Sequence, residues 1–216
     1  MTATPSLSTE EWQKLSEEKQ HHCKVLASAL EFARHKHRNQ QRKDVARTPY
    51  ITHPIEVCEI LKHAGISDSA VLAAALLHDT VEDTDTTHSE LVNTFGETIA
   101  GLVRECTDDK RLPKATRKQL QITKAAHISP SAQLVKLADK ISNLRSLCHS
   151  RPVGWSDTRI RGYFDWSYLV CRPKFGQNAI LDAEIKQLCA EQEGLPEDVL
   201  QQRLHEYLEA MSAAKN

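Results

Sequence analysis

The stretch Leu-Leu-His-Asp-Thr-Val-Glu-Asp-Thr at residues 76–84 joins an apolar run to a cluster of acidic residues. The apolar run, residues 71–77, predicts a buried helix. His78 and Asp79 follow at the point where such a helix meets solvent. An imidazole and a carboxylate side by side can hold a divalent metal ion. The alternative is an ordinary helix end, with solvated acids and a histidine packed against the core.

Two further acids extend this stretch. Glu82 lies four residues after His78, and Asp83 lies four residues after Asp79. If the helix continues for another turn, each pair shares a face, and if it breaks at Thr80, the side chains still line one pocket. A carboxylate close to a metal site can take up a proton. The spacing therefore favours a site in which metal ligands and a base lie together.

The composition narrows the class of protein. The 216 residues suffice for one domain with a helical extension, and a hydrophobic content of 40% supplies a core. Lys and Arg (28) nearly balance Asp and Glu (29), so no overall positive field favours nucleic-acid binding. The six cysteines are scattered without a Cys-x-x-Cys pair, and the longest apolar run is too short to span a membrane. With no basic-then-apolar leader, we expect a cytoplasmic protein without nucleic-acid or membrane partners.

Helical periodicity runs through most of the chain and predicts an all-α fold. No segment alternates cleanly between apolar and polar residues, and there are only 7 glycines. The strongest amphipathic pattern spans residues 131–148, with Asp139 in its middle beside the apolar face. Further helices are expected at about residues 21–37, 54–63, 71–79, 89–96, 97–107, 115–127, 156–172, 179–193 and 196–213. Trp155 and Trp166 are expected to close the core.

The chain is divided into three parts on this basis. Residues 1–20 form an N-terminal extension, of which residues 1–8 are expected to be disordered. A Ser8–Glu11 capping box is expected to open a short helix near Trp12. Residues 21–195 form the main domain. Residues 196–216 form a C-terminal helix and tail.

Three separate parts of the chain supply candidate metal ligands. His53 lies at the start of a helix, His78 and Asp79 at the end of another, and Asp139 within a third. A carboxylate beside a core must be paired, hydrogen-bonded or metal-bound, because burying it alone is too costly. The alternative for Asp139 is an ion pair with a basic neighbour on an exposed flank of its own helix.

This order of residues resembles the signature of the HD-domain metal-dependent phosphohydrolases, which is a His, then His-Asp at a helix end, then a distant Asp. Four motifs carry a narrower resemblance to the hydrolase domain of RelA/SpoT-type alarmone enzymes, in particular their small stand-alone metazoan branch. They are Arg42-Lys43 with Thr-Pro-Tyr-Ile-Thr-His-Pro at 48–54, His-Asp-Thr-Val-Glu-Asp-Thr at 78–84, Thr-Asp-Asp-Lys at 107–110, and Lys-Leu-Ala-Asp-Lys-Ile-Ser-Asn-Leu-Arg at 136–145. The resemblance covers about residues 26–178. It implies an HD-domain helical bundle with additional C-terminal helices.

The resemblance implies that four side chains hold a Mn²⁺ ion: His53, His78, Asp79 and Asp139. Two imidazoles, two carboxylates and room for waters suit a six-coordinate ion better than a closed tetrahedral zinc site. By the same resemblance, Glu82 and Asp83 orient and deprotonate the attacking water. A metal acidifies such a water and offsets charge on the phosphoryl oxygens.

The implied substrate is guanosine-3′,5′-bis(diphosphate), a signal of the stringent, or starvation, response, which hydrolysis converts to GDP and pyrophosphate. Because the whole chain is nearly neutral, local groups must bind this polyanion. Six residues match substrate-binding positions of the family: Arg42, Lys43, Lys114, Asn143, Arg159 and Tyr163. The first two are expected near the base, Asn143 near the ribose or base, and the others near the phosphates or sugar.

Two other functions stay open. The same chemistry on another nucleotide could remove the 2′-phosphate of NADPH, which also presents a purine, a ribose and a phosphate. A non-catalytic module would bind a nucleotide without turnover, and the intact Glu82–Asp83 pair speaks against it. The sequence does not indicate the oligomeric state.

Overall fold

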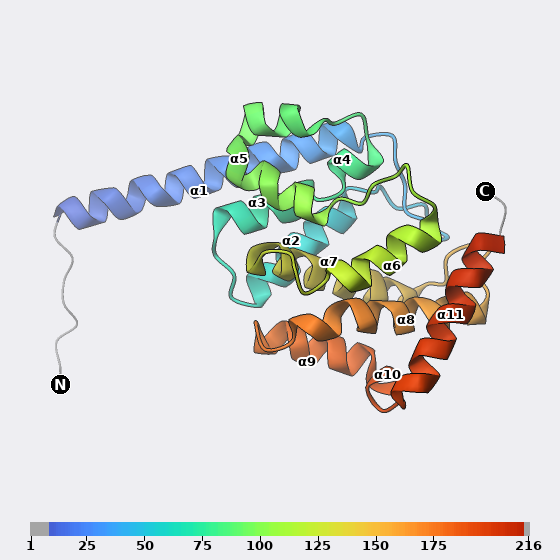
Figure 1. Ribbon diagram of the computed structural model, residues 1–216. Helices are drawn as coiled ribbons and strands as arrows, with labels where there is room; N and C mark the ends of the chain where they lie inside the picture. The colour runs from blue at the N-terminus through green and yellow to red at the C-terminus, as the bar shows by residue number, and fades with distance from the viewer. Residues whose placement is uncertain (1–8, 214–216) are drawn as a thin grey trace, which may run out of the picture.

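The computed structural model describes residues 9–213 and is built of helices (Figure 1). These residues contain no strand, which confirms the expected all-α class. The helices are α1 (Thr9–Lys36), α2 (Thr52–His63), α3 (Ser69–Leu77), α4 (Thr80–Asp83), α5 (His88–Cys106), α6 (Lys114–Lys124), α7 (Pro130–His149), α8 (Asp157–Cys171), the short 3-10 turn η1 (Arg172–Lys174), α9 (Ala179–Leu188), α10 (Ala190–Glu193) and α11 (Glu197–Ala213). None of the described helices combines the length and the apolar character needed to cross a membrane.

Helix α3 forms the centre of the bundle. Every side chain from residue 71 to residue 77 is apolar and buried, and the helix packs against α1, α2, α5 and α7. Asp68 begins it by accepting a hydrogen bond of 2.7 Å from the amide of Ala70. Burial of each leucine side chain there contributes about 2 kcal/mol. Because α3 is enclosed on several sides, its C-terminal end, where His78 follows, has a fixed position.

Helices α6, α8 and α11 form a second group beside this bundle, and α7 joins the two groups (Figure 1). Trp166 of α8 is 2% exposed, as expected for a residue that closes the core. The same expectation for Trp155 is wrong, since this residue is half-buried and lines a cavity. It follows a turn at Gly154 (φ 80°) before α8 begins, which places it at the rim of the helical group.

Two expected helix boundaries differ in the structure. Helix α1 is continuous, although the sequence suggested a short helix and then a second one from residue 21. No Gly or Pro interrupts residues 9–36, and Glu, Lys and Gln are good helix formers. Its N-terminal half extends beyond the bundle (Figure 1). Conversely, α5 has a kink at Gly96 (φ 82°), where two helices were expected. Ser8 of the expected capping box, and residues 1–8 expected to be disordered, lie outside the described residues.

The loop between α1 and α2 closes on itself through hydrogen bonds. The amide of Arg42 donates to the Thr48 carbonyl at 2.8 Å, and the amide of Tyr50 donates to the Gln40 carbonyl at 2.9 Å. The Asp44 carboxylate accepts from the amide and the hydroxyl of Thr48 at 2.9 and 2.6 Å. On α7, the Ser146 hydroxyl accepts a 2.8 Å hydrogen bond from the Arg42 guanidinium. The loop therefore presents its basic residues to the helix that carries Asp139.

Candidate active site

A break in the helix after α3 positions the first site residues. Helix α3 ends at Leu77, and α4 is a single turn that begins at Thr80. The Thr80 hydroxyl donates a 2.7 Å hydrogen bond to the Leu77 carbonyl, which has lost its helical partner. His78 and Asp79 lie in the break, and Glu82 lines the same cavity as both of them. Of the two possibilities for this stretch, a continued helix or a break near Thr80, the structure has the break.

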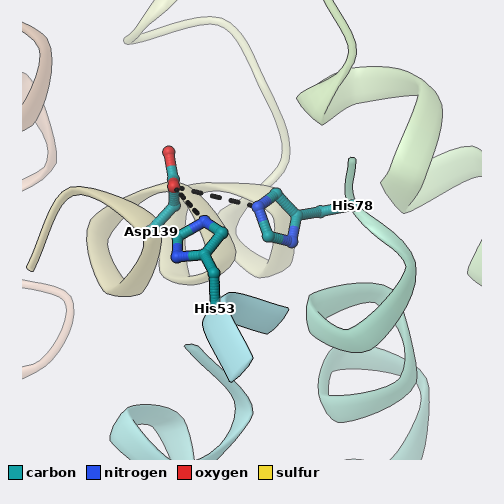
Figure 2. Close-up of side chains that lie close together, drawn as sticks. All are labelled: His53, His78 and Asp139. Carbon is teal, nitrogen blue, oxygen red and sulfur yellow. Dashed lines mark ion pairs between the residues drawn. The ribbon is translucent and has the colours of Figure 1, made fainter. Parts of the chain in front are cut away.

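Four potential metal ligands meet at one point. Asp139 Oδ1 lies 3.1 Å from His53 Nε2 and 3.8 Å from His78 Nε2. Asp79 Oδ2 lies 3.7 Å and 3.1 Å from the same two nitrogens. Figure 2 shows His53, His78 and Asp139 pointing toward one another from three separate segments. The ligand atoms of these three residues all lie within 4.8 Å of one another, and Asp79 flanks this group. The arrangement can hold a divalent metal ion.

Hydrogen bonds on the far side of each imidazole determine which nitrogen faces the cluster. His78 Nδ1 donates to the carbonyl of Ala75 at 2.7 Å. His53 Nδ1 donates to the hydroxyl of Ser142 at 2.9 Å, and this hydroxyl donates to Glu56 at 2.8 Å. Metal-binding histidines are typically oriented in this way. The buried Nε2 of His78 has no hydrogen-bond partner in the described part of the chain. The donor set therefore fits a divalent ion.

The charges of the cluster also favour a cation. Burial disfavours charged carboxylates, but His78 and His53 hold the pKa of Asp79 below its usual range. Burial is likewise outweighed at Asp139, where the Lys140 ammonium and the two imidazoles hold the pKa well below its usual range. Lys140 Nζ donates to Asp139 Oδ2 at 2.7 Å. The lysine pair and the histidine cluster thus use different oxygens of one carboxylate. The expected ion pair with a basic neighbour exists, but it is largely buried and does not lie on an exposed flank.

Sequence reasoning did not single out two residues that orient this cluster. The Tyr50 hydroxyl donates to the Asp79 carboxylate. Burial and the Asp79 charge raise the pKa of Tyr50 well above its ordinary value, so that the hydroxyl keeps its proton. Ser142, which accepts from His53, is the other one. A sequence signal exists only for Ser142, which lies three residues after Asp139 and so shares its helical face.

Glu82 is held by two donors at the edge of the cluster. The Arg117 guanidinium donates to Oε1 at 3.0 Å, and the amide of Asp108 donates to Oε2 at 3.2 Å. Burial and the Asp108 carboxylate raise the pKa of Glu82 above its ordinary value. A raised pKa brings a carboxylate closer to the range in which it exchanges protons near neutral pH. Glu82 is therefore suited to act as a general base.

We expect Asp108→Asn to move the acid limb of the kcat–pH profile to lower pH. A general base works only when deprotonated, so activity falls as the pH drops through its pKa. Removing the Asp108 charge lowers the pKa of Glu82 and leaves the amide donor in place. The measurement is kcat between about pH 5 and pH 8 for both proteins at saturating metal. If the acid limb stays in place or moves to higher pH, the pKa that it measures is not that of Glu82.

The structure separates Asp83 from Glu82. The Asp83 side chain forms an ion pair with Lys110, and it lines neither of the two cavities at the cluster. Its side chain is 37% exposed, against 19% for Glu82. The two members of the expected catalytic pair thus have different surroundings.

Two cavities meet at the cluster. The smaller, of about 190 Å³, contains the four potential ligands and Glu82, and the larger has about 790 Å³. Tyr50, His53 and Asn143 line both. Of the expected substrate-binding residues, Arg42, Lys43, Asn143 and Tyr163 line the larger cavity, whereas Lys114 and Arg159 line neither. Asn143 also donates to Asp139 Oδ1 at 2.6 Å, so it supports the ligand cluster directly.

Comparison with known proteins defines the class. The model of the HD-domain family matches residues 29–157, which include all four potential ligands. With the all-α fold and the His/His/Asp cluster, the chain is an enzyme of the HD-domain metal-dependent phosphohydrolase class.

Two curated relatives and one solved structure narrow the class of protein further. The chain is 54% identical over 167 residues to the mouse protein guanosine-3′,5′-bis(diphosphate) 3′-pyrophosphohydrolase MESH1, covering 77% of this chain and 93% of that one. It is 54% identical over 164 residues to the human protein of the same name, covering 76% and 92%. Among solved structures, it matches a metazoan orthologue of SpoT that hydrolyses ppGpp and plays a role in starvation responses. The match has a TM-score of 0.76 and 46% sequence identity, and it covers 80% of this chain and 97% of that one. The chain belongs to the MESH1 family.

Proposed function

We propose that the protein is a Mn²⁺-dependent guanosine-3′,5′-bis(diphosphate) 3′-pyrophosphohydrolase. The observation that carries the proposal is the pair of cavities that share Tyr50, His53 and Asn143 in their walls. A nucleotide with phosphate at the 3′ position needs a pocket for the nucleoside beside a metal-binding pocket. The relatives named above act on this substrate by their names.

The larger cavity suits the nucleoside and its 5′-phosphates. Its volume of about 790 Å³ lies within the range of small-molecule sites. Arg42 and Lys43 enter from the closed loop, and Trp155 and Tyr163 supply aromatic faces on which a purine or a sugar can pack. Asn143 lies at the junction, where it can contact the ribose.

The smaller cavity suits the reacting phosphate. His53, His78, Asp79 and Asp139 would hold Mn²⁺, which supplies an acidified water and offsets phosphoryl charge. Glu82 takes the proton of the attacking water. A new bond forms between the water oxygen and the phosphorus attached to the ribose 3′ oxygen. The bond between that phosphorus and the 3′ oxygen breaks, the 3′ oxygen takes up a proton to become the ribose hydroxyl, and the products are GDP and pyrophosphate.

A side-by-side turnover assay tests the proposal. Purified protein with Mn²⁺ is given guanosine-3′,5′-bis(diphosphate) in one reaction and NADPH in the other, with Asp139→Ala protein as the background control. We expect GDP and pyrophosphate from the first. Phosphate and NADH from the second alone would assign the pocket to the redox cofactor instead. Tight nucleotide binding with no turnover in either reaction would identify a non-catalytic binding module.

A further inference from the structure

A row of aromatic rings follows the start of α8 along the larger cavity. The ring centres of Trp155 and Tyr163 are 5.7 Å apart, and those of Tyr163 and Trp166 are 5.2 Å apart. Two cations lie over this row. The Arg159 guanidinium is 4.3 Å from the ring centre of Trp155, and Lys118 Nζ is 3.2 Å from that of Trp166.

These two cations differ from their neighbours because neither has an acidic partner. Lys140 pairs with a metal ligand at 2.7 Å, and Arg117 pairs with Glu82 at 3.0 Å. Within residues 9–213, by contrast, no carboxylate oxygen lies within 4.0 Å of a charged nitrogen of Lys118 or Arg159, and Arg159 Nε is buried without any hydrogen-bond partner. Both side chains are half-buried, and cations in such surroundings are normally paired.

The missing negative charge points to an anion from outside the chain. Burial and the nearby Lys140 charge lower the pKa of Lys118 well below its ordinary value, which an added anion would reverse. The ring centre of Tyr163 is 4.7 Å from Lys118 Nζ, and Tyr163 lines the larger cavity. Lys118 itself lines neither cavity, so the Tyr163 ring is what lies between the ammonium and the larger cavity. Phosphate groups are the anions that the proposed substrate brings there.

We propose that Lys118 binds a phosphate group of the nucleotide substrate and that helix α11 holds it in position through Tyr207. The inference rests on the proposed function. Lys114, for which the family resemblance implies such a contact, is exposed at the first turn of α6. Lys118 lies one turn further along the same face and contacts the aromatic row.

The role of α11 in positioning Lys118 can be inferred from the contacts that fix α6. No residue of α6 between its bounds is buried, so few contacts fix this helix. The Trp166 indole donates to the Lys118 carbonyl at 2.9 Å. Tyr207 of α11 is 2% exposed, and its ring centre lies 5.6 Å from Lys118 Nζ. The ring packs on α8 so closely that a Cβ added at Gly162 would lie 2.5 Å from it.

Tyr207 of α11 and Trp166 of α8 thus both lie beside the Lys118 ammonium. Helix α11 lies beyond residues 29–157, the segment that the HD-domain family model matches. This chain therefore adds a support for α6 from outside the matched domain. The aromatic surface around the ammonium holds it in one orientation while leaving its charge unneutralised.

The test compares steady-state kinetics with Mn²⁺ and guanosine-3′,5′-bis(diphosphate). We expect Lys118→Met to raise KM roughly 10- to 100-fold with a much smaller change in kcat, as for loss of a charged hydrogen bond. Lys118→Arg should recover most of this loss. Lys124→Met, an exposed lysine at the end of the same helix, is the matched control and should leave KM unchanged.

Tyr207 is tested through its coupling to Lys118. We expect Tyr207→Leu to raise KM in the same direction, Tyr207→Phe to have little effect, and Lys118→Met with Tyr207→Leu to be no worse than Lys118→Met alone. Additive effects in the double variant would overturn the role of Tyr207. Thermal unfolding of each variant separates this coupling from loss of the fold.

The outcomes for the inference and for the proposed function are distinct. If the unmodified protein hydrolyses the substrate and Lys118→Met has the same KM, the inference is wrong and the function stands. If the unmodified protein does not hydrolyse it, the function is wrong. Calorimetric titration with inorganic pyrophosphate then decides the inference, because weaker binding by Lys118→Met supports the anion contact and equal binding excludes it.

Discussion

Replacing Asp139 with alanine should remove both the metal and the activity. Asp139 Oδ1 lies 3.1 and 3.8 Å from the two imidazole nitrogens, so the substitution takes away the carboxylate oxygen that both face. Loss of an outer hydrogen bond to a metal ligand already costs 10- to 100-fold in affinity, and loss of a ligand should cost at least roughly 100-fold. We expect bound metal to fall from about one ion per chain to near zero, with turnover at background.

Metal content after gel filtration, measured beside kcat, checks this result. Asp139→Asn keeps the side-chain volume and separates loss of charge from loss of packing. The Asp139→Asn variant is needed because Asp139→Ala also leaves the buried Lys140, which is 4% exposed, without its partner. Asp85→Ala, which removes an exposed carboxylate paired with Lys36, is the matched control and should behave as the unmodified protein. Normal turnover in a folded Asp139→Ala protein would exclude the four-ligand assignment.

The second large effect is expected at Glu82. Glu82→Gln keeps the size of the side chain and an acceptor for Arg117, but it cannot take up a proton. We expect metal content and KM to stay close to their original values while kcat falls by ~10² or more. The acid limb of the kcat–pH profile should disappear with it.

Two further variants sharpen this assignment. Glu59→Gln, at an exposed glutamate paired with Lys62 on α2, is the matched control and should have no effect. Asp83→Asn should lower kcat less than Glu82→Gln, because the Asp83 side chain is turned toward Lys110. A larger loss in Asp83→Asn would transfer the role of general base to that residue.

Much of the site could be predicted from the sequence because its signals are local. The uniform apolar run at residues 71–77 indicates a helix buried on every side. A carboxylate beside the apolar face of α7 needs a partner, and this argument leads to Asp139 without knowledge of the fold. His53 and His78 then follow as donors at the ends of other helices.

The remaining parts of the site depend on contacts that spacing does not determine. Glu82 and Asp83 diverge because the helix breaks at Leu77, and that break is stabilised by the hydrogen bond from the Thr80 hydroxyl. The support of Lys118 by Tyr207 joins two helices that are far apart in the chain, and no periodic pattern reports such a pairing. Turn residues such as Gly154 and Gly96 mark where the chain changes direction, without specifying what it then contacts.

The hydrogen bonds behind His53 have a thermodynamic consequence. The Ser142 hydroxyl joins this imidazole to the Glu56 carboxylate, whose Oε2 is 3.6 Å from the Arg42 guanidinium in the wall of the larger cavity. A nucleotide phosphate that attracts Arg42 leaves the negative charge of Glu56 less neutralised. Through the Ser142 hydroxyl, this charge makes the His53 imidazole a stronger ligand for a cation. Because such linkage is reciprocal, the cation must strengthen nucleotide binding by the same factor. Metal affinity measured on the empty protein should therefore understate the affinity that applies during turnover.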